Sequence, residues 1–324
     1  MSESSILPLK RSGGPENISR SKRHAGRSAN LPCGKLSRFR YNKIMPKKNL
    51  GKGSYGIAYL AIDTLTDMDF VVKVVRKTND ALKEIETGMK MVRSRFVCRT
   101  YGYAEDEVNY YIVMSNAGDT DLFTFISENP KIFAENPLLF WSVAHCILQG
   151  IRYIHQRFVH MDLKPENVCF RTTQKGKITG VKIIDFGFSV EIGNNDFGRG
   201  TANYMSPEIA SGYPGSRASD IWSLGVLFYV MLSGSFCKQI ASKNPNKIKN
   251  ASSVSTKLRE IYKTGKFTPF SQLSTDPEIF AIQKFIERCL VVESEKRPTA
   301  DELLGHIPSH LTDLVTQGLL ELTI

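Results

Sequence analysis

Apolar residues in the first part of the chain gather in short runs of the length expected for β-strands. Residues 57–60, 70–75 and 110–114 are rich in β-branched and aromatic side chains, and polar segments separate them. Residues 81–92 lie among these runs and are patterned as a helix. The pattern predicts a small, mostly β lobe with one main helix over residues 45–115.

Helical spacing replaces these short runs in the rest of the chain. Between Pro137 and Phe158, apolar residues recur every three or four positions, as they do in a buried helix. We therefore expect a larger, mostly α lobe over residues 116–310, followed by a short helix or tail over residues 311–324. Together the two lobes predict an α+β fold.

The basic charge of the chain is concentrated at its start. The chain of 324 residues has a net charge of +11, and residues 1–48 contain twelve Lys and Arg but only two acids. Residues 1–44 have almost no apolar pattern, so we expect a disordered basic leader. Its run 20–27 is either a nuclear-import signal, an arm attracted to nucleic acid or acidic partners, or a solvated tail. A secretory signal is excluded, because no apolar stretch follows the charges.

Cysteine use and hydropathy point to an intracellular, soluble protein. The six cysteines are scattered without a C-x-x-C pair, so neither a zinc site nor a disulfide framework is expected. The longest apolar stretch, residues 221–232, is too short to span a bilayer. We expect a monomer in the cytoplasm, the nucleus or both.

Short motifs with distinctive chemistry follow one another along the chain. The loop Gly51-Lys52-Gly53-Ser54-Tyr55-Gly56 comes first, and Lys73 lies in a strand-like run after it. His160-Met161-Asp162-Leu163-Lys164-Pro165-Glu166-Asn167 and then Asp185-Phe186-Gly187 follow. The glycine loop joins two strand-like segments, which argues against a dinucleotide-binding fold, where it joins a strand to a helix. In this order the motifs resemble those of the protein kinase family over roughly residues 45–310.

The resemblance implies a two-lobed fold that binds ATP together with Mg²⁺. Glycines let backbone N–H groups approach the triphosphate, because no Cβ stands in the way. Lys73 is expected to bind the α- and β-phosphates and to pair with a glutamate of the helix. The nucleotide contacts implied by the resemblance are Leu50, Gly51, Lys52, Gly53, Ser54, Tyr55, Gly56, Ala58, Val71, Lys73, Glu84, Ser115, Ala117 and Asp121.

The partner of Lys73 and the role of Asp121 each have two interpretations. Glu84 and Glu86 both lie in the predicted helix, and a gapless alignment with common kinases places Ile85 at the expected position. We favour Glu84, because Glu84-Ile85 matches the Glu-Ile pair usual in the family. Asp121 either contacts ribose or a basic substrate residue, or simply caps a helix.

Ala58 and Val71 depart from the family pattern around the adenine. The position of Ala58 usually holds Val, and the position of Val71 usually holds Ala. We expect the two changes to offset each other in volume, as volume-conserving swaps are tolerated in packed sites. Residues 115–118 resemble the linker between the lobes, whose backbone is expected to bind adenine.

The second and third motifs carry the residues implied to perform the chemistry. Asp162 is expected to orient the substrate hydroxyl and accept its proton, and Lys164 to neutralise the transferring phosphate. Asn167 and Asp185 are expected to hold Mg²⁺. Lys164 and Thr201 match the serine/threonine type, so the resemblance implies transfer of the ATP γ-phosphoryl group to protein Ser and Thr hydroxyls.

Met161 stands where most kinases have an arginine that binds a phosphate on the activation loop. Methionine cannot make that contact, and Ser189 is the only hydroxyl residue between Gly187 and Gly200. We therefore expect activity that does not require activation-loop phosphorylation.

Several residues are expected to support the site or its substrates. Glu208 should pair with Arg297, and Asp220 should brace the backbone of the catalytic loop. Glu166 is acidic where kinases that prefer basic substrates bind Arg, but Val230 occupies a second position that is often acidic in that group. The preference for basic sites is therefore weak. Residues 238–266 are polar and basic, and they are either a docking loop or an ordinary solvated insertion.

Two other classes of function stay open at this point. A catalytically weak scaffold would bind Mg·ATP without turnover, although the intact catalytic positions argue against it. A nucleic-acid-associated protein would act mainly through the leader, and its binding would depend on salt.

Overall fold

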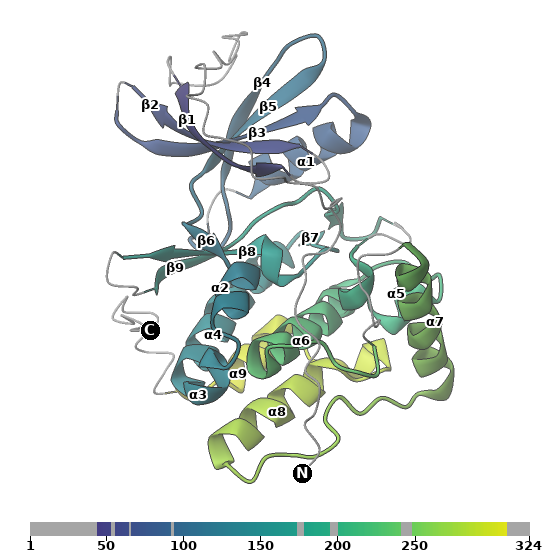
Figure 1. Cartoon of the computed structure of the whole chain (residues 1–324). Coiled ribbons are helices and arrows are strands. Elements are labelled where there is room, and N and C mark those ends of the chain that lie inside the picture. Colours follow the sequence, from purple (N-terminus) through teal and green to yellow (C-terminus); the bar gives the residue numbers. More distant parts are fainter. Residues whose placement is uncertain are drawn as a thin grey trace. The chain divides into compact units, whose positions relative to one another are not determined.

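The structure, a computed structural model, describes residues 44–52, 56–64, 66–91, 94–173, 178–194, 200–240 and 248–309. The basic leader and the predicted tail over 311–324 lie outside these residues. The described residues form two compact units. We call residues 44–117 with 185–187 the N-terminal unit, and residues 118–184 with 188–309 the C-terminal unit (Figure 1). The first division falls after Ala117, two residues beyond the expected boundary at 115.

An antiparallel sheet with one helix makes up the N-terminal unit. The strands follow the order β1-β2-β3-β5-β4. They are β1 (Ile44–Lys52), β2 (Ile57–Asp63), β3 (Asp69–Arg76), β4 (Thr100–Glu105) and β5 (Asn109–Ser115). The helix α1 (Asn79–Lys90) starts two residues before the expected position, because the Thr78 side chain accepts a hydrogen bond from the Ala81 N–H and caps it.

The alternation of side chains along β3 decides which of them face α1. Phe70 and Val72 are buried on one face with Ala61 and Val113. Val75 is buried on the other face together with Ala81 and Ile85 of α1. Because side chains alternate along a strand, Lys73 shares the face of Val75 and points toward the helix.

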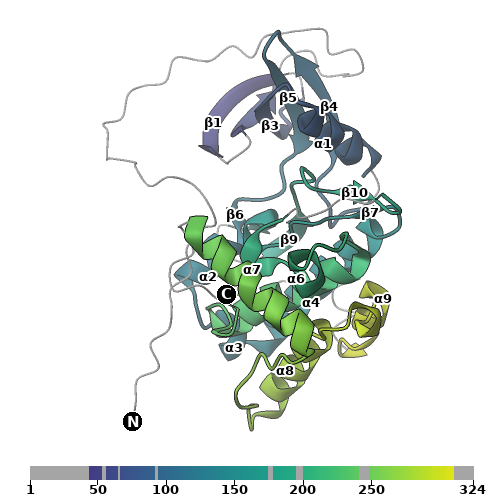
Figure 2. The same cartoon turned by 90° about the vertical axis from the view of Figure 1, so that its right-hand side faces the viewer.

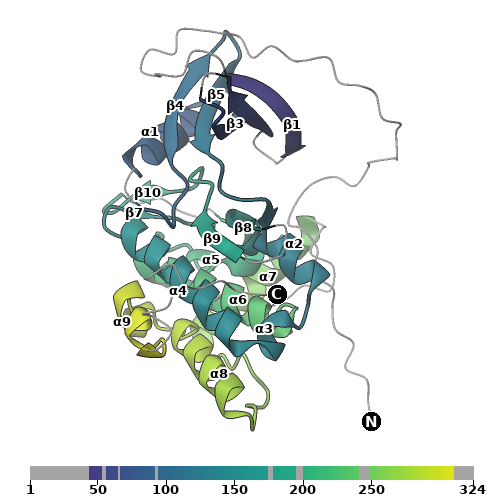
Figure 3. The same ribbon diagram turned by 90° about the vertical axis from the view of Figure 1, so that its left-hand side faces the viewer.

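The C-terminal unit is mostly helical. Its helices are α2 (Leu122–Glu128), α3 (Ile132–Glu135), α4 (Pro137–Ile154), α5 (Pro207–Ala210), α6 (Arg217–Ser233), α7 (Ile248–Thr264), α8 (Pro277–Cys289) and α9 (Ala300–Gly305). Figures 2 and 3 show from opposite sides that α8 lies beside α6 and α9 beside α4. The α+β fold with a mostly β and a mostly α lobe is therefore confirmed.

Short strands and turns connect these helices. The strands β6 (Thr120–Asp121), β8 (Val168–Thr172) and β9 (Ile178–Ile183) form one small sheet. A two-stranded sheet pairs β7 (Phe158–Val159) with β10 (Val190–Glu191). Single 3-10 turns cover Pro165–Asn167, Ala202–Tyr204 and Ser294–Lys296.

Two local expectations were wrong. The helix expected over 137–158 ends at Ile154, because Phe158 and Val159 extend to pair with β10. The stretch 238–266 is not simply a solvated insertion, because residues 248–264 form α7. Val254, Leu258 and Ile261 are buried at helical spacing and give α7 an apolar face. Within the described residues, no helix is both long enough and apolar enough to span a membrane.

Candidate active site

Lys73 forms the centre of a charged cluster in the N-terminal unit. Its Nζ lies 2.6 Å from Glu84 Oε1 and 3.2 Å from Asp185 Oδ1. Glu84 is buried on the inner face of α1, whereas Glu86 is exposed. The glutamate that pairs with Lys73 is therefore Glu84, and Glu86 is a solvated helix carboxylate.

The two carboxylates keep Lys73 charged. Burial by itself lowers the pKa of Lys73, but the charges and hydrogen bonds of Asp185 and Glu84 outweigh burial and raise the pKa above its usual value. The pKa of Glu84 is raised by burial, and the charge of Lys73 opposes that shift. Lys73 is thus a fixed ammonium group, which is the chemistry needed to bind phosphate oxygens.

The glycine-rich loop is described only in part. Gly53, Ser54, Tyr55 and the side chain of Lys52 lie outside the described residues. A Cβ added at Gly56 would lie 2.2 Å from the carbonyl oxygen of Val74, so this glycine allows β2 to approach β3 closely. Gly51 has φ +153° and open space around it, and Leu50 beside it is exposed.

Ala58 and Val71 lie on the face of the sheet that carries Lys73. Ala58 is paired with Lys73, and Val71 is paired with Leu60 on one side and Met114 on the other. Ala58 and Val71 are therefore diagonal neighbours on one face, about 7–8 Å apart by strand geometry. A larger side chain at one position can offset a smaller one at the other only if the two are close neighbours on one face. The placement of Ala58 and Val71 meets this condition.

The residues expected to contact adenine and ribose also have structural tasks. Ser115 Oγ accepts a hydrogen bond from the Arg99 N–H at 3.1 Å, and the Ser115 N–H donates to the Arg99 carbonyl at 2.8 Å. Ala117 is buried. Asp121 Oδ1 accepts from the Thr124 N–H at 2.7 Å and caps α2. Asp121 therefore caps a helix, as one of its two interpretations predicts. A contact with ribose stays a prediction.

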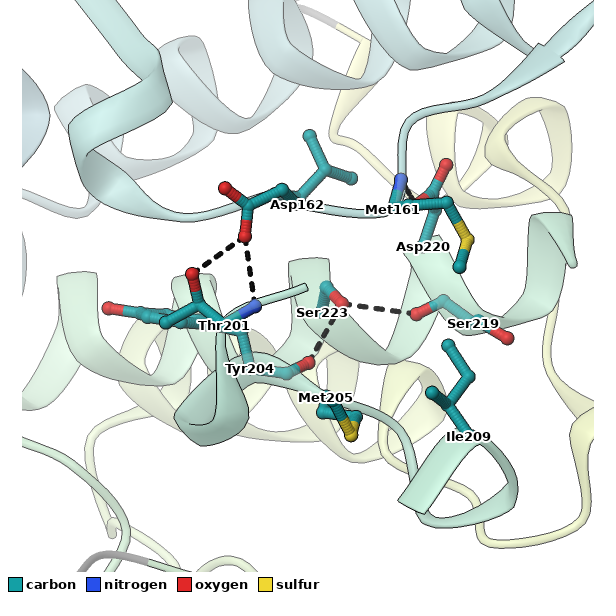
Figure 4. A pocket seen from close by; sticks show the side chains of 10 residues that line it. Met161, Asp162, Thr201, Tyr204, Met205, Ile209, Ser219, Asp220 and Ser223 are labelled. Atoms are coloured by element: carbon teal, nitrogen blue, oxygen red, sulfur yellow. Dashed lines mark hydrogen bonds between the residues drawn. The ribbon is translucent and has the colours of Figure 1, made fainter. Parts of the chain in front are cut away.

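Asp162 is the centre of a second cluster, in the C-terminal unit. Its Oδ1 accepts hydrogen bonds from the Thr201 hydroxyl at 2.6 Å and from the Thr201 N–H at 2.9 Å (Figure 4). Its Oδ2 accepts from Lys164 Nζ at 2.7 Å and from Asn167 Nδ2 at 3.3 Å. Lys164 also donates to the Thr201 hydroxyl oxygen at 3.0 Å. The network fixes a buried carboxylate beside an ammonium group.

Asp220 of α6 holds the backbone that carries Asp162. Its two carboxylate oxygens accept hydrogen bonds from the N–H groups of His160 at 2.7 Å and Met161 at 2.9 Å. The expected brace is therefore confirmed. His155 Nε2 also lies 2.9 Å from Asp220 Oδ2. Its partner lies 65 residues further along the chain, so nothing in the sequence around His155 marks this contact.

Glu208 and Arg297 form the expected buried ion pair. Two parallel hydrogen bonds join the guanidinium and the carboxylate, at 2.7 and 2.8 Å. Burial alone would raise the pKa of Glu208, but the hydrogen bonds and charge of Arg297 lower it below its usual value. The pair ties the end of the segment after Thr201 to the loop before α9.

Asn167 and Asp185 each carry a side-chain oxygen of the kind that Mg²⁺ accepts as a ligand. Asn167 Nδ2 donates to the Asp162 carbonyl at 2.7 Å, which turns its Oδ1 away from Asp162. Asp185 has φ +66°, and its Oδ1 accepts from the Gly187 N–H at 3.1 Å. No cluster of three His, Cys, Asp or Glu able to hold a metal occurs among the described residues. A binding role of the amide and of the carboxylate toward Mg²⁺ stays a prediction for each residue.

The comparisons with known proteins agree with this geometry. A family model of the protein kinase domain matches residues 44–307. Calcium-dependent protein kinase 4 of Plasmodium berghei (strain Anka) is 30% identical over 80% of this chain and 48% of its own length. Serine/threonine-protein kinase 17A of Oryctolagus cuniculus is 27% identical over 81% of this chain and 65% of its own length. Death-associated protein kinase 2 of Homo sapiens is 27% identical over 80% of this chain and 69% of its own length.

The chain belongs to the protein kinase domain family, since the family model covers most of its length. It spans about half the length of the Plasmodium berghei kinase that it matches. Residues 44–307, which the family model matches, contain both clusters described above.

Proposed function

We propose that this protein is a serine/threonine protein kinase, which transfers the γ-phosphoryl group of ATP to hydroxyl groups of protein substrates. The observation that carries the proposal is the network in which Lys164, Asn167 and Thr201 all bind the buried carboxylate of Asp162. The names of the serine/threonine kinases to which the chain is similar support the same class.

The chemical roles follow from the groups in this network. Asp162 orients the substrate hydroxyl and accepts its proton while the new bond from that oxygen to the γ-phosphorus forms and the bond to ADP breaks. Lys164 neutralises the charge of the transferred group. Thr201 and Asn167 hold the carboxylate in place, so most of the catalysis is positioning and charge stabilisation.

The cluster around Lys73 has the complementary task of binding nucleotide. Lys73 binds the α- and β-phosphates and is held by Glu84. The glycine-rich loop covers the phosphates, and the backbone at Ser115 and Ala117 binds adenine. Asp121 contacts ribose in addition to capping α2. Asn167 and Asp185 would each supply an oxygen ligand to Mg²⁺, which would screen the negative charge of the phosphates.

Thr201 and Lys164 support a preference for serine and threonine. Their side chains lie 3.0 Å apart and both contact Asp162, so the proton acceptor is fixed close to the backbone of the segment at 201. Glu166 adds a weak preference for basic residues in the substrate.

The kinase acts without phosphorylation of its activation loop. Met161 is buried among apolar side chains and offers no charge to a phosphate. Arg157 pairs with Glu191 at 2.7 Å, and β10 pairs with β7, so unphosphorylated contacts hold the start of the loop.

The basic leader gives the kinase a second means of binding. Its charge suits nuclear import or contact with nucleic acid or acidic partners. Salt-sensitive binding to DNA or RNA that disappears on deletion of residues 1–40 is the expected signature of a nucleic-acid partner.

ATP turnover on a generic basic protein substrate tests the proposed reaction. We expect turnover in the range of about 1–100 s⁻¹ for the wild type. Asp162→Asn should lower it by at least about a hundredfold, because a positioned base contributes that much or more. Asp301→Asn is the matched control, since Asp301 is an exposed carboxylate of α9 and should leave turnover unchanged. Nucleotide binding without turnover in the wild type would instead favour the scaffold function.

A further inference from the structure

Met161 has an apolar environment built from separate parts of the C-terminal unit. Its side chain is buried with Val159 of β7 and Ile209 of α5. The partly buried side chains of Phe188, Val190 and Met205 pack against the same cluster. Phe188 and Val190 come shortly after the Asp-Phe-Gly motif, whereas Met205 and Ile209 follow Thr201. The cluster therefore joins the catalytic loop to both ends of the activation segment.

The end of the Met161 side chain occupies the space beside Gly215. A Cβ added at Gly215 would lie 2.2 Å from both Sδ and Cε of Met161, and 3.7 Å from Cδ1 of Ile209. Gly215 is not among the glycines with positive φ, so its backbone conformation does not itself require glycine. The missing side chain at 215 is what makes room for the thioether.

The backbone of Met161 is held as firmly as its side chain. Met161 has φ +70°, which is uncommon for a residue with a side chain and is retained only where the surroundings enforce it. Asp220 accepts its N–H at 2.9 Å. On the other side, a Cβ at Gly200 would lie 2.5 Å from its carbonyl oxygen, so the backbone at 200 lies close against it. Asp162 is the next residue in the chain, so the position of its backbone depends on that of Met161.

Figure 4 shows where Met161 lies relative to the proposed proton acceptor, Asp162. Met161 and Ile209 lie on one side of the pocket, and Asp162 is joined to Thr201 on the other. In the chain, Thr201 lies between Gly200, whose backbone is close to the Met161 carbonyl, and Met205, which packs against the cluster that contains Met161. We therefore expect a displacement of Met161 to move both partners of the hydrogen bond between Asp162 and Thr201.

We propose that Met161 is a positioning residue: seated beside Gly215, its side chain fixes the activation segment against the catalytic loop and so aligns Asp162 with Thr201. This inference rests on the proposed kinase function. It goes beyond the loss of an arginine, because it assigns an active packing role to the methionine and names the glycine that accommodates it.

A double-mutant cycle between positions 161 and 215 tests the proposal. Gly215→Ala should displace the thioether, since the added methyl needs the space that Sδ and Cε occupy. We expect Gly215→Ala and Met161→Ala each to lower kcat about tenfold or more, because small misplacements of reacting groups are costly. The KM for ATP should change by less than about twofold, because the Lys73 cluster is not touched. Met161→Leu keeps the apolar volume and should retain most of the activity.

The double variant Met161→Ala with Gly215→Ala gives the decisive comparison. Once the thioether is gone, the methyl at 215 has room and refills part of the space, so the double variant should be no worse than Met161→Ala alone. Losses that multiply, or a Gly215→Ala variant as active as the wild type, would overturn the proposal. Met231→Ala is the matched control, because it removes a fully buried methionine of α6 outside the cluster. It should lower the thermal midpoint and leave kcat unchanged.

The same variants separate this inference from the proposed function. An inactive wild type contradicts the proposed function, and the cycle is then measured as thermal midpoints, where strongly non-additive shifts support the contact between Met161 and Gly215. An active wild type with additive losses retains the function and contradicts the role of Met161.

Discussion

The hydroxyl of Thr201 donates a hydrogen bond of 2.6 Å to the carboxylate of Asp162, although the two residues are 39 positions apart in the chain. The Thr201 N–H reinforces this bond at 2.9 Å on the same oxygen. Both contacts come from Thr201, in the segment that follows residues 195–199, which lie outside the described residues. The position of the proposed base therefore depends on how that segment is held.

Replacing Thr201 with Val should lower kcat about tenfold to a hundredfold. Val has a similar shape, but it leaves the Asp162 oxygen and Lys164 without their shared hydroxyl partner. Thr201→Ser keeps the hydroxyl and is the matched control, which should retain most of the activity. Steady-state kinetics with varied ATP is the measurement. Equal activity of the Val and Ser variants would show that the hydroxyl is not needed.

Glu84 and Glu86 offer a comparison within one helix. Glu84→Gln removes the charge that lies 2.6 Å from Lys73, so we expect Mg·ATP to bind at least about tenfold more weakly or turn over that much more slowly. Glu86→Gln alters an exposed carboxylate two residues away and should leave both quantities unchanged. Nucleotide titration and turnover of the two variants provide the measurement. A larger effect from Glu86→Gln would reassign the partner of Lys73.

The sequence predicted the residues of this site that lie in short motifs of the kinase family, among them Lys73, Asp162 and Lys164. Lys73 faces α1 because strand residues alternate, and Lys164 reaches Asp162 because only one residue separates them. The family pattern favoured Glu84 over Glu86, and the structure confirms Glu84; periodicity alone does not fix the choice, since it depends on the rotation of α1 against the sheet. That rotation is set by Ala81 and Ile85 packing on Val75.

Contacts between distant residues were predicted only where the family pattern names them, as for Glu208 with Arg297 and for Asp220 with the catalytic loop. Nothing local marked His155 as a partner of Asp220, or Gly215 as the space for Met161. The helix expected through Phe158 was also wrong for this reason. Phe158 and Val159 suit a helix or a strand, and the pairing with Val190 and Glu191 decides between them.

The buried pair of Glu208 and Arg297 should contribute strongly to stability. Glu208→Gln leaves the Arg297 guanidinium buried without its counter-charge, and breaking such a pair costs roughly 3–5 kcal/mol. Arg297 keeps three backbone carbonyl partners, at Val291, Val292 and Ala218, so a value at the lower end is expected. Urea unfolding followed by circular dichroism, with Glu293→Gln as an exposed control, measures the loss.

The stability that Glu208 and Arg297 contribute should depend on pH. Burial alone would raise the pKa of Glu208 in the folded protein, but the hydrogen bonds and charge of Arg297 hold that pKa below its usual value of about 4.5. Its stabilising contribution is therefore fully present above about pH 4.5 and is lost as the pH falls through the lower, folded pKa. In Glu208→Gln this part of the acid sensitivity should be absent. An unfolding free energy that falls equally steeply with acid in both proteins would contradict the assignment.

Ala58 and Val71 are expected to act together on nucleotide binding. Ala58→Val adds volume to the face that carries Lys73, where Val71 already exceeds the usual alanine, so ATP should bind more weakly. Adding Val71→Ala should restore much of the affinity. Titration of ATP into both variants is the measurement, and equal weakening in the two would show that the positions do not compensate.

Dephosphorylated wild-type protein should be as active as the protein treated with inactive phosphatase. Ser189 is the only hydroxyl residue between Gly187 and Gly200, and its Oγ donates to the His160 carbonyl at 3.3 Å. A phosphoryl group on Ser189 would remove that bond and place charge next to the apolar cluster of Met161. Ser189→Ala should therefore lose no more than a few-fold in kcat, whereas Ser189→Glu should lose more, because it adds charge at the same place.

The opposite order, with Ser189→Glu active and both Ser189→Ala and the dephosphorylated protein inactive, would mean that the loop needs a phosphate in spite of Met161. A loss on phosphatase treatment that Ser189→Ala does not share would instead locate an activating phosphate outside this segment, since the residues between Gly187 and Gly200 have no other acceptor.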